Sequence, residues 1–155
     1  MTAWSSIPAA CAALQTLVAA QVAADSLASQ ILVCVGEPPM DQPNDIIQLV
    51  TNVRRVVRPE AMMGSYNVSG PLEETYEIQC LVSSWSGSSD PVAILNRAYV
   101  LASYVESAVR VDPSLGGTVL EAHPSGTDGG QSTWTTEPVG RLCELTVTIE
   151  ARNLN

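Results

Sequence analysis

One long amphipathic segment in the second half of the chain limits the possible folds more than any other feature. Asp90 is a favourable N-cap residue, and Pro91 follows at the first helical position, where no backbone N–H is needed. Apolar residues then recur at three- and four-residue spacing: Ile94, Leu95, Ala98, Leu101, Ala102, Val105 and Val109. This spacing predicts a helix from Pro91 to about Val111 with one apolar face.

A second helix is predicted near the start of the chain. Ser5 or Ser6 can cap it, and Pro8 fits its first turn. Alanine, the best helix former, fills most positions between the apolar residues, and the pattern continues to about Ala24. The apolar stripe consists of Ile7, Cys11, Leu14, Leu17, Val18 and Val22.

The remaining apolar segments have the composition and alternation of β-strands. Strands are expected at 31–35, 46–50, 76–84, 118–122 and 142–151, and Val53, Val56 and Val57 continue the second one as a strand or a hairpin. Stretches rich in Gly, Pro, Ser and Thr predict flexible loops near 59–74 and 123–138. Together these elements predict a single α+β domain over 1–155, with two layers. In it, a mixed, mostly antiparallel sheet of four or five strands packs against two helices.

Composition excludes several functions. The chain has a formal net charge of −9, and all seven of its basic residues are arginines. Binding to DNA phosphates needs clustered positive charge, so we expect no such binding. The apolar start at 7–22 has no basic residue before it and is interrupted by Gln15 and Gln21, so neither an export signal nor a membrane span is expected.

Residues with catalytic potential are sparse. His123 is the only histidine, no phosphate-binding loop or metal-binding motif is present, and Glu73, Glu74 and Glu77 are expected to be solvated charges on a strand. The four cysteines, none at C-x-x-C spacing, are expected to be reduced, buried thiols. The sequence therefore predicts no catalytic, cofactor-binding or metal-binding residue, and no enzyme.

Three features are candidates for contacts with partners. Arg54, Arg55 and Arg58 lie within five positions; they either pair with local acids or form an intersubunit patch that meets a neighbour's carboxylates. Trp134, in the polar stretch 123–138, either folds back over its own sheet or anchors a partner. The stretch 62–71 is a third candidate arm.

The chain from Tyr76 to Ala122, together with its last strand, resembles the tail terminator (tail completion) proteins of long-tailed bacteriophages. A strand reading like 77–82 precedes a helix that carries an arginine, and a D-P-x-L-G-G turn follows. Then come a strand, a variable loop and a closing strand like 145–152. The resemblance marks Asp112, Pro113, Leu115, Gly116 and Gly117 as a fold-determining turn.

The resemblance implies a structural role in the tail-neck region of a virion that is assembled in the cytoplasm of the bacterial host. Such subunits form a ring, typically a hexamer, on the finished tail tube, end its polymerisation and offer a surface to the head connector, without a cofactor. Acidic residues facing the lumen would let DNA pass without specific binding. The alternatives are another neck or tail component, such as a head–tail joining protein or a tube subunit, and a small enzyme or ligand-binding domain.

Overall fold

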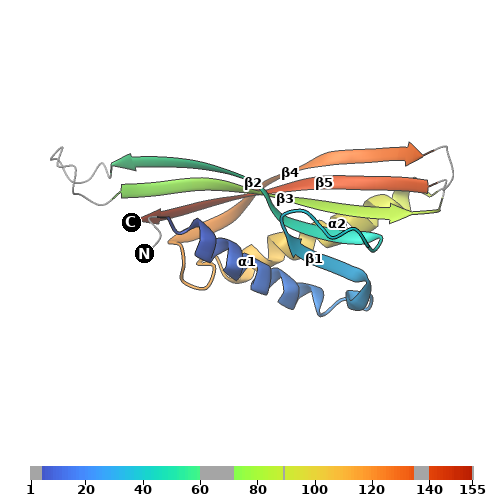
Figure 1. The fold of residues 1–155 in the computed structure, drawn as a ribbon, viewed down its shortest axis with the longest axis horizontal. Coiled ribbons are helices and arrows are strands. Elements are labelled where there is room, and N and C mark those ends of the chain that lie inside the picture. Colours follow the sequence, from blue (N-terminus) through green and yellow to red (C-terminus); the bar gives the residue numbers. More distant parts are fainter. Residues whose placement is uncertain (1–4, 60–71, 89, 135–139, 155) are drawn as a thin grey trace.

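The protein is a two-layer α+β structure, in which two helices cover one face of a five-stranded sheet (Figure 1). The computed structural model describes residues 5–59, 72–88, 90–134 and 140–154. Its elements are α1 (Ile7–Val22), the short 3-10 helix η1 (Ala28–Gln30), β1 (Ile31–Val35), β2 (Asp45–Pro59), β3 (Leu72–Ser86), α2 (Pro91–Val111), β4 (Glu121–Trp134) and β5 (Gly140–Leu154). Within the described residues, no helix has the length and apolar character needed to span a membrane.

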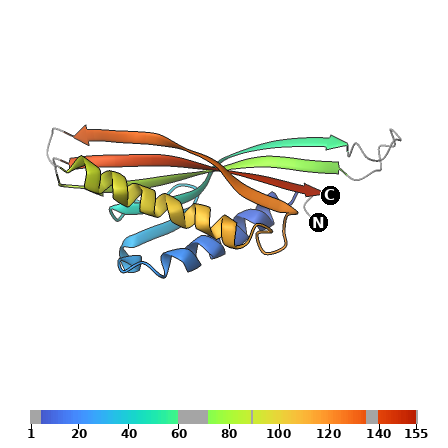
Figure 2. The same cartoon turned by 180° about the vertical axis from the view of Figure 1, so that it is seen from behind.

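The strands lie in the order β1-β2-β3-β5-β4. β1 pairs in parallel with the first residues of β2, and the other three pairs are antiparallel. The predicted mixed, mostly antiparallel sheet is therefore confirmed. α2 connects β3 to β4 and packs against the sheet beside α1, as the view from behind shows (Figure 2).

Local sequence explains the ends of both helices. The Asp90 side chain accepts hydrogen bonds from the backbone N–H groups of Val92 and Ala93, which caps α2 as predicted. α1 ends at Val22, two residues before the predicted end. Ser6 is at the N-cap position of α1, but its own side chain makes no capping bond, because it is committed to a residue of β3 that is described below.

The core lies between the two helices and one face of the sheet. The predicted alternation of β3 is confirmed: Tyr76, Ile78, Cys80 and Val82 are buried against the helices. Cys11 and Cys143 are also buried, whereas Cys34 is half-buried. Burial raises the pKa of Cys80 to about 11, so this thiol stays protonated at neutral pH.

Both predicted loops are shorter than expected. The loop predicted at 123–138 is wrong for 123–134, which belongs to β4, an edge strand whose backbone pairs with β5 over its whole length. Pro59 ends β2 and 72–74 begin β3, so these parts of the loop predicted at 59–74 are strand as well. The strand expected at 118–122 starts only at Glu121. The rest of both loops, and the candidate arm at 62–71, lie outside the described residues.

The sheet is longer than the helical layer. At one end the paired strands β2 and β3 continue beyond the helices (Figure 1). We call the paired residues 52–59 and 72–79 the β2–β3 arm; Tyr76 and Ile78, at its base, are buried against the helices, and its tip projects. The arm carries β-branched side chains that nothing described covers: Val56 and Val57 are 38% and 39% exposed.

Candidate interaction surface

The β2–β3 arm begins at an irregularity in β2. The pairing of β2 with β3 shifts between Gln48 and Asn52, and within this bulge Val50 has a positive φ of 59°, which is uncommon for a β-branched residue. The partner strand β1 ends at the same place, with Val35 opposite Leu49. From 50 to 59, therefore, β2 has no strand partner on its outer side among the described residues.

The three clustered arginines of the arm are divided between the two faces of the sheet. Arg55 lies on the helix-covered face and forms an ion pair with Glu74. Arg54 and Arg58 lie on the opposite face, which we call the open face, where their cross-strand partners are Glu77 and Glu73. Arg54 and Arg58 are exposed and form no ion pair within 4.0 Å with any acid that the structure describes. The local pairing considered for the cluster thus holds for Arg55 alone.

The open face carries an excess of acidic side chains. They alternate with the buried residues of each strand, and cross-strand partners share a face. By register, this face presents Glu73, Glu77, Glu121, Asp128, Glu144 and Glu150, and also Arg54, Arg58 and Arg152. Among the described residues, two contacts between ionisable side chains cross between strands on this face. Arg152 donates from Nε to Glu73, and Nε2 of His123 lies 3.4 Å from Glu150, an ion pair only when the histidine is protonated.

Glu74 joins the arm to the start of α1. Its side chain is fully buried, and it accepts hydrogen bonds from the Arg55 guanidinium, from the hydroxyl groups of Ser5 and Ser6, and from the backbone N–H of Ser6. The Ser6 hydroxyl also lies 3.1 Å from that of Tyr76. A carboxylate is favourable here, because the N-terminus of a helix carries partial positive charge and unpaired N–H groups. The expectation that Glu74 is a solvated charge was wrong.

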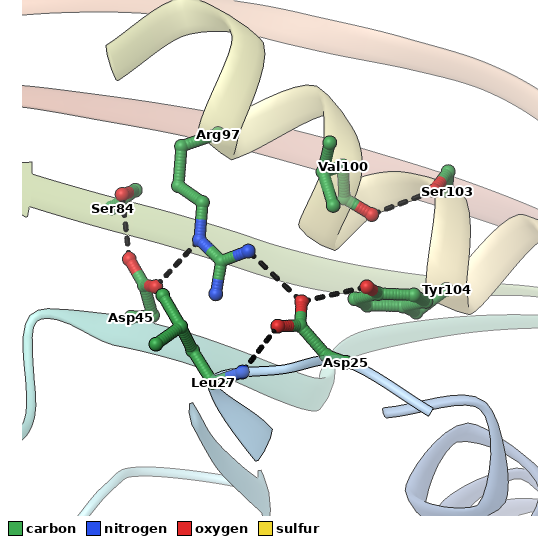
Figure 3. Close-up of polar contacts among 8 residues, drawn as sticks. All are labelled: Asp25, Leu27, Asp45, Ser84, Arg97, Val100, Ser103 and Tyr104. Carbon is green, nitrogen blue, oxygen red and sulfur yellow. Dashed lines mark hydrogen bonds and ion pairs between the residues drawn. The ribbon is translucent and has the colours of Figure 1, made fainter. Parts of the chain in front are cut away.

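A second polar cluster lies beneath α2 (Figure 3). The Arg97 guanidinium donates from Nε to Asp45 at 2.7 Å and from Nη1 to Asp25 at 2.9 Å. Asp45 also accepts from the Ser84 hydroxyl, and Asp25 from the Tyr104 hydroxyl and the backbone N–H of Leu27. Arg97 thus connects α2, β2 and the turn after α1. Its Nη2 is buried and has no hydrogen-bond partner among the described residues.

Hydrogen bonds in this cluster favour the charged forms of Asp25 and Arg97. The bonds from Tyr104 and from the Leu27 N–H, with smaller contributions from Arg97, lower the pKa of Asp25 to about 2. Burial alone would lower the pKa of Arg97, but its bonds to Asp45 and Asp25 outweigh burial and raise that pKa. Both groups are therefore fully ionised at neutral pH.

The D-P-x-L-G-G segment forms a tight turn between α2 and β4. The Asp112 carboxylate accepts from the hydroxyl and the backbone N–H of Ser114 and from the N–H of Gly116. The bond from the Ser114 hydroxyl contributes most to lowering the pKa of Asp112. Leu115, Gly116 and Gly117 have φ values of 47°, 68° and 77°, and the Leu115 side chain is fully buried. Only glycine adopts such values without strain, which explains the glycines at the last two positions.

The remaining candidates lie apart from the arm. Trp134 is the last residue of β4, opposite Gly140 in the register, and not part of a loop as expected. Within the described residues, no group of three or more His, Cys, Asp or Glu side chains is placed to hold a metal ion.

The sequence interpretation missed both buried polar clusters. Arg97 was considered only as the arginine that the family pattern places on this helix, and Asp25 and Asp45 were assigned no contact. The available signal was Arg97 itself, which is the one charged residue between Asp90 and Glu106 on a helix with an apolar face. A buried cation of this kind requires acidic partners.

Comparison with known proteins adds one structural likeness. No protein-family model matches the chain, and no curated protein matches it. Among solved structures, the chain is similar to one described as belonging to the virion of a native gene transfer agent particle. The two are 9% identical, with a TM-score of 0.45, over 97% of this chain and 100% of the other.

Proposed function

We propose that this protein is a structural, non-enzymatic component of a bacteriophage virion. In this proposal it caps the tail tube as a ring, typically a hexamer in the family it resembles, ends tube polymerisation and offers the head its attachment surface in the tail-neck region. The resemblance of 76–122 and of the last strand to tail terminator proteins supports the specific role. The order of helices and strands agrees with the order that the resemblance implied.

The observation that carries the proposal is the projecting β2–β3 arm. The arm leaves Val56 and Val57 exposed, and in the part of the chain that the structure describes β2 has no strand partner on its outer side there, so the arm is suited to contact with another protein. At the other edge of the sheet lies β4, which differs from β2 in sequence and charge. Two unlike surfaces on one subunit favour heterologous, head-to-tail contacts, and such contacts close into a ring when the rotation between copies permits it.

The open face fits the wall of a channel for DNA. It carries more acidic residues than arginines, and the chain as a whole has a charge of −9. If this face lines the lumen, it repels DNA phosphates, and the genome passes without specific binding. The proposed partners are thus further copies of the chain, the tail tube protein and a head-completion or connector protein.

The experiment is the assembly of phage tails with and without this protein. We expect tails made without it to have abnormal lengths in electron micrographs, and the purified protein added to growing tubes to stop them at once. On tube ends it should form particles whose mass is a fixed multiple of 16.4 kDa. Open-ended fibres of the protein alone would instead identify a tube subunit. Normal tail length together with failed head attachment would identify a head–tail joining protein, and turnover of a small compound would identify an enzyme.

A further inference from the structure

The two edges of the sheet differ in charge, and this difference suggests how copies of the chain meet. The outer edge of β2 from 52 to 59 carries Arg54, Arg55 and Arg58 and no acidic residue. The opposite edge strand, β4, carries Glu121 and Asp128 and no arginine. Both acids are exposed, and neither forms an ion pair with a described residue.

The directions of these strands suit a cyclic assembly. β2, β3, β5 and β4 are antiparallel to one another in succession, so β2 and β4 run in opposite directions. When one copy is rotated about an axis parallel to the strands, its β4 therefore comes to lie antiparallel to β2 of its neighbour. This is the pairing that most of the sheet already uses, and the arm has unpaired backbone groups on that side among the described residues.

The same charges oppose the alternative twofold dimers. Pairing of β2 with β2 would bring the arginines of two copies together, and pairing of β4 with β4 would bring the acids together. Like charges in facing positions across a strand pair are destabilising. The charges therefore select the unlike pair of edges, while backbone hydrogen bonds supply most of the affinity, because exposed ion pairs contribute little by themselves.

From these observations we propose that the 52–59 edge of β2 pairs, as an antiparallel strand, with the β4 edge of a second copy of this chain. Through the register of the sheet, Glu121 is level with Val56, which lies between Arg54 and Arg58. The two arginines therefore flank Glu121 of the neighbouring copy on the open face. The inference rests on the proposed ring and specifies its subunit contact: one sheet continues from each copy to the next.

Charge reversal tests this contact in the full-length chain. The first variant is Arg54→Glu with Arg58→Glu, and the second is Glu121→Arg. Each should raise the dissociation constant between copies about tenfold or more, measured by mass photometry and by electron microscopy of tube ends. The variant with all three changes brings opposite charges together again with their places exchanged, and we expect it to form rings again. Arg110→Glu, on the exposed side of α2, is the matched control and should leave assembly unchanged.

Hydrogen exchange gives a second readout that does not depend on substitutions. Upon ring formation, amides on the outer side of 52–59 and of 121–126 should exchange at least about tenfold more slowly. Rings that form equally well in all variants, with unchanged exchange at 52–59, would overturn the edge contact and leave the ring proposal standing. A chain that forms no ring at all, alone or on tube ends, would overturn both. Circular dichroism of each variant shows whether it is folded.

Discussion

Arg97 Nε lies 2.7 Å from Oδ2 of Asp45, which joins the second turn of α2 to the first residue of β2. The same guanidinium reaches Asp25 in the turn after α1, so one side chain connects three segments that are distant in the sequence. The carboxylates of Asp25 and Asp45, which are largely buried, depend on this guanidinium to balance their charge. The cluster is therefore a point at which the helical layer is fixed relative to the sheet.

We expect Arg97→Met to destabilise the fold by about 2 to 4 kcal/mol, because it leaves Asp25 and Asp45 without their cation. Urea unfolding at pH 7 measures this change. The matched control is Arg110→Met on the same helix, where the side chain is exposed, and we expect a change of less than about 0.5 kcal/mol. Equal effects of the two substitutions would show that the buried ion pairs are not important for stability.

The pKa of Asp25 predicts how stability depends on pH. Because the pKa falls from 3.8 to about 2 on folding, Asp25 stabilises the protein fully above about pH 4. This contribution, about 2 kcal/mol, is lost as the pH falls from about 4 toward 2. The difference in unfolding free energy between the natural chain and Asp25→Asn should therefore shrink over this range. Tyr104→Phe removes the main hydrogen bond to Asp25, and an NMR titration should then show a higher pKa for this carboxyl group.

Glu74→Gln tests the connection between the arm and α1. We expect the free energy of unfolding to fall by about 1 to 3 kcal/mol. The buried acceptor loses its negative charge, while Arg55 and the N-terminus of α1 still need a negatively charged partner. Faster hydrogen exchange of the first amides of α1 should accompany the loss. Glu77→Gln, on the open face of the same strand, is the control, and a similar loss there would contradict the assigned role of Glu74.

Gly129 and Gly130 are neighbours on β4 that should respond differently to alanine. A Cβ at Gly129, where φ is 149°, would lie 2.1 Å from the backbone oxygen of Glu144. A Cβ at Gly130 would meet no atom within 4 Å. Gly129→Ala should therefore lower the thermal midpoint by several degrees and weaken the pairing of β4 with β5, since the clash is with backbone. Gly130→Ala should change the midpoint little, and calorimetry compares the two.

The sequence predicted best those elements whose side chains alternate between core and solvent. α2 and β3 were recognised because Asp90, Pro91 and the regular apolar spacing report directly on burial. The arm of β2 was left open as strand or hairpin, since side chains exposed on both faces lose that alternation.

β4 could not be recognised for a related reason. It is an edge strand, and few of its side chains, such as that of Ala122, reach the core. Its backbone hydrogen bonds to β5 form with any sequence that tolerates extended geometry. Gly126, Gly129 and Gly130 therefore gave the pattern of a loop. The contacts of Arg97 and Glu74 join segments about 20 to 70 residues apart, and no local pattern reports on such pairs.

The uninterrupted register of β3 with β5, from Glu73 to Ser86, has a mechanical consequence. Backbone hydrogen bonds in an antiparallel pair lie across the strands. A force applied along the strands loads all of these bonds in shear at the same time, whereas a force applied across them would open the bonds one after another. The molecule should therefore resist tension along its long axis far better than peeling at either tip.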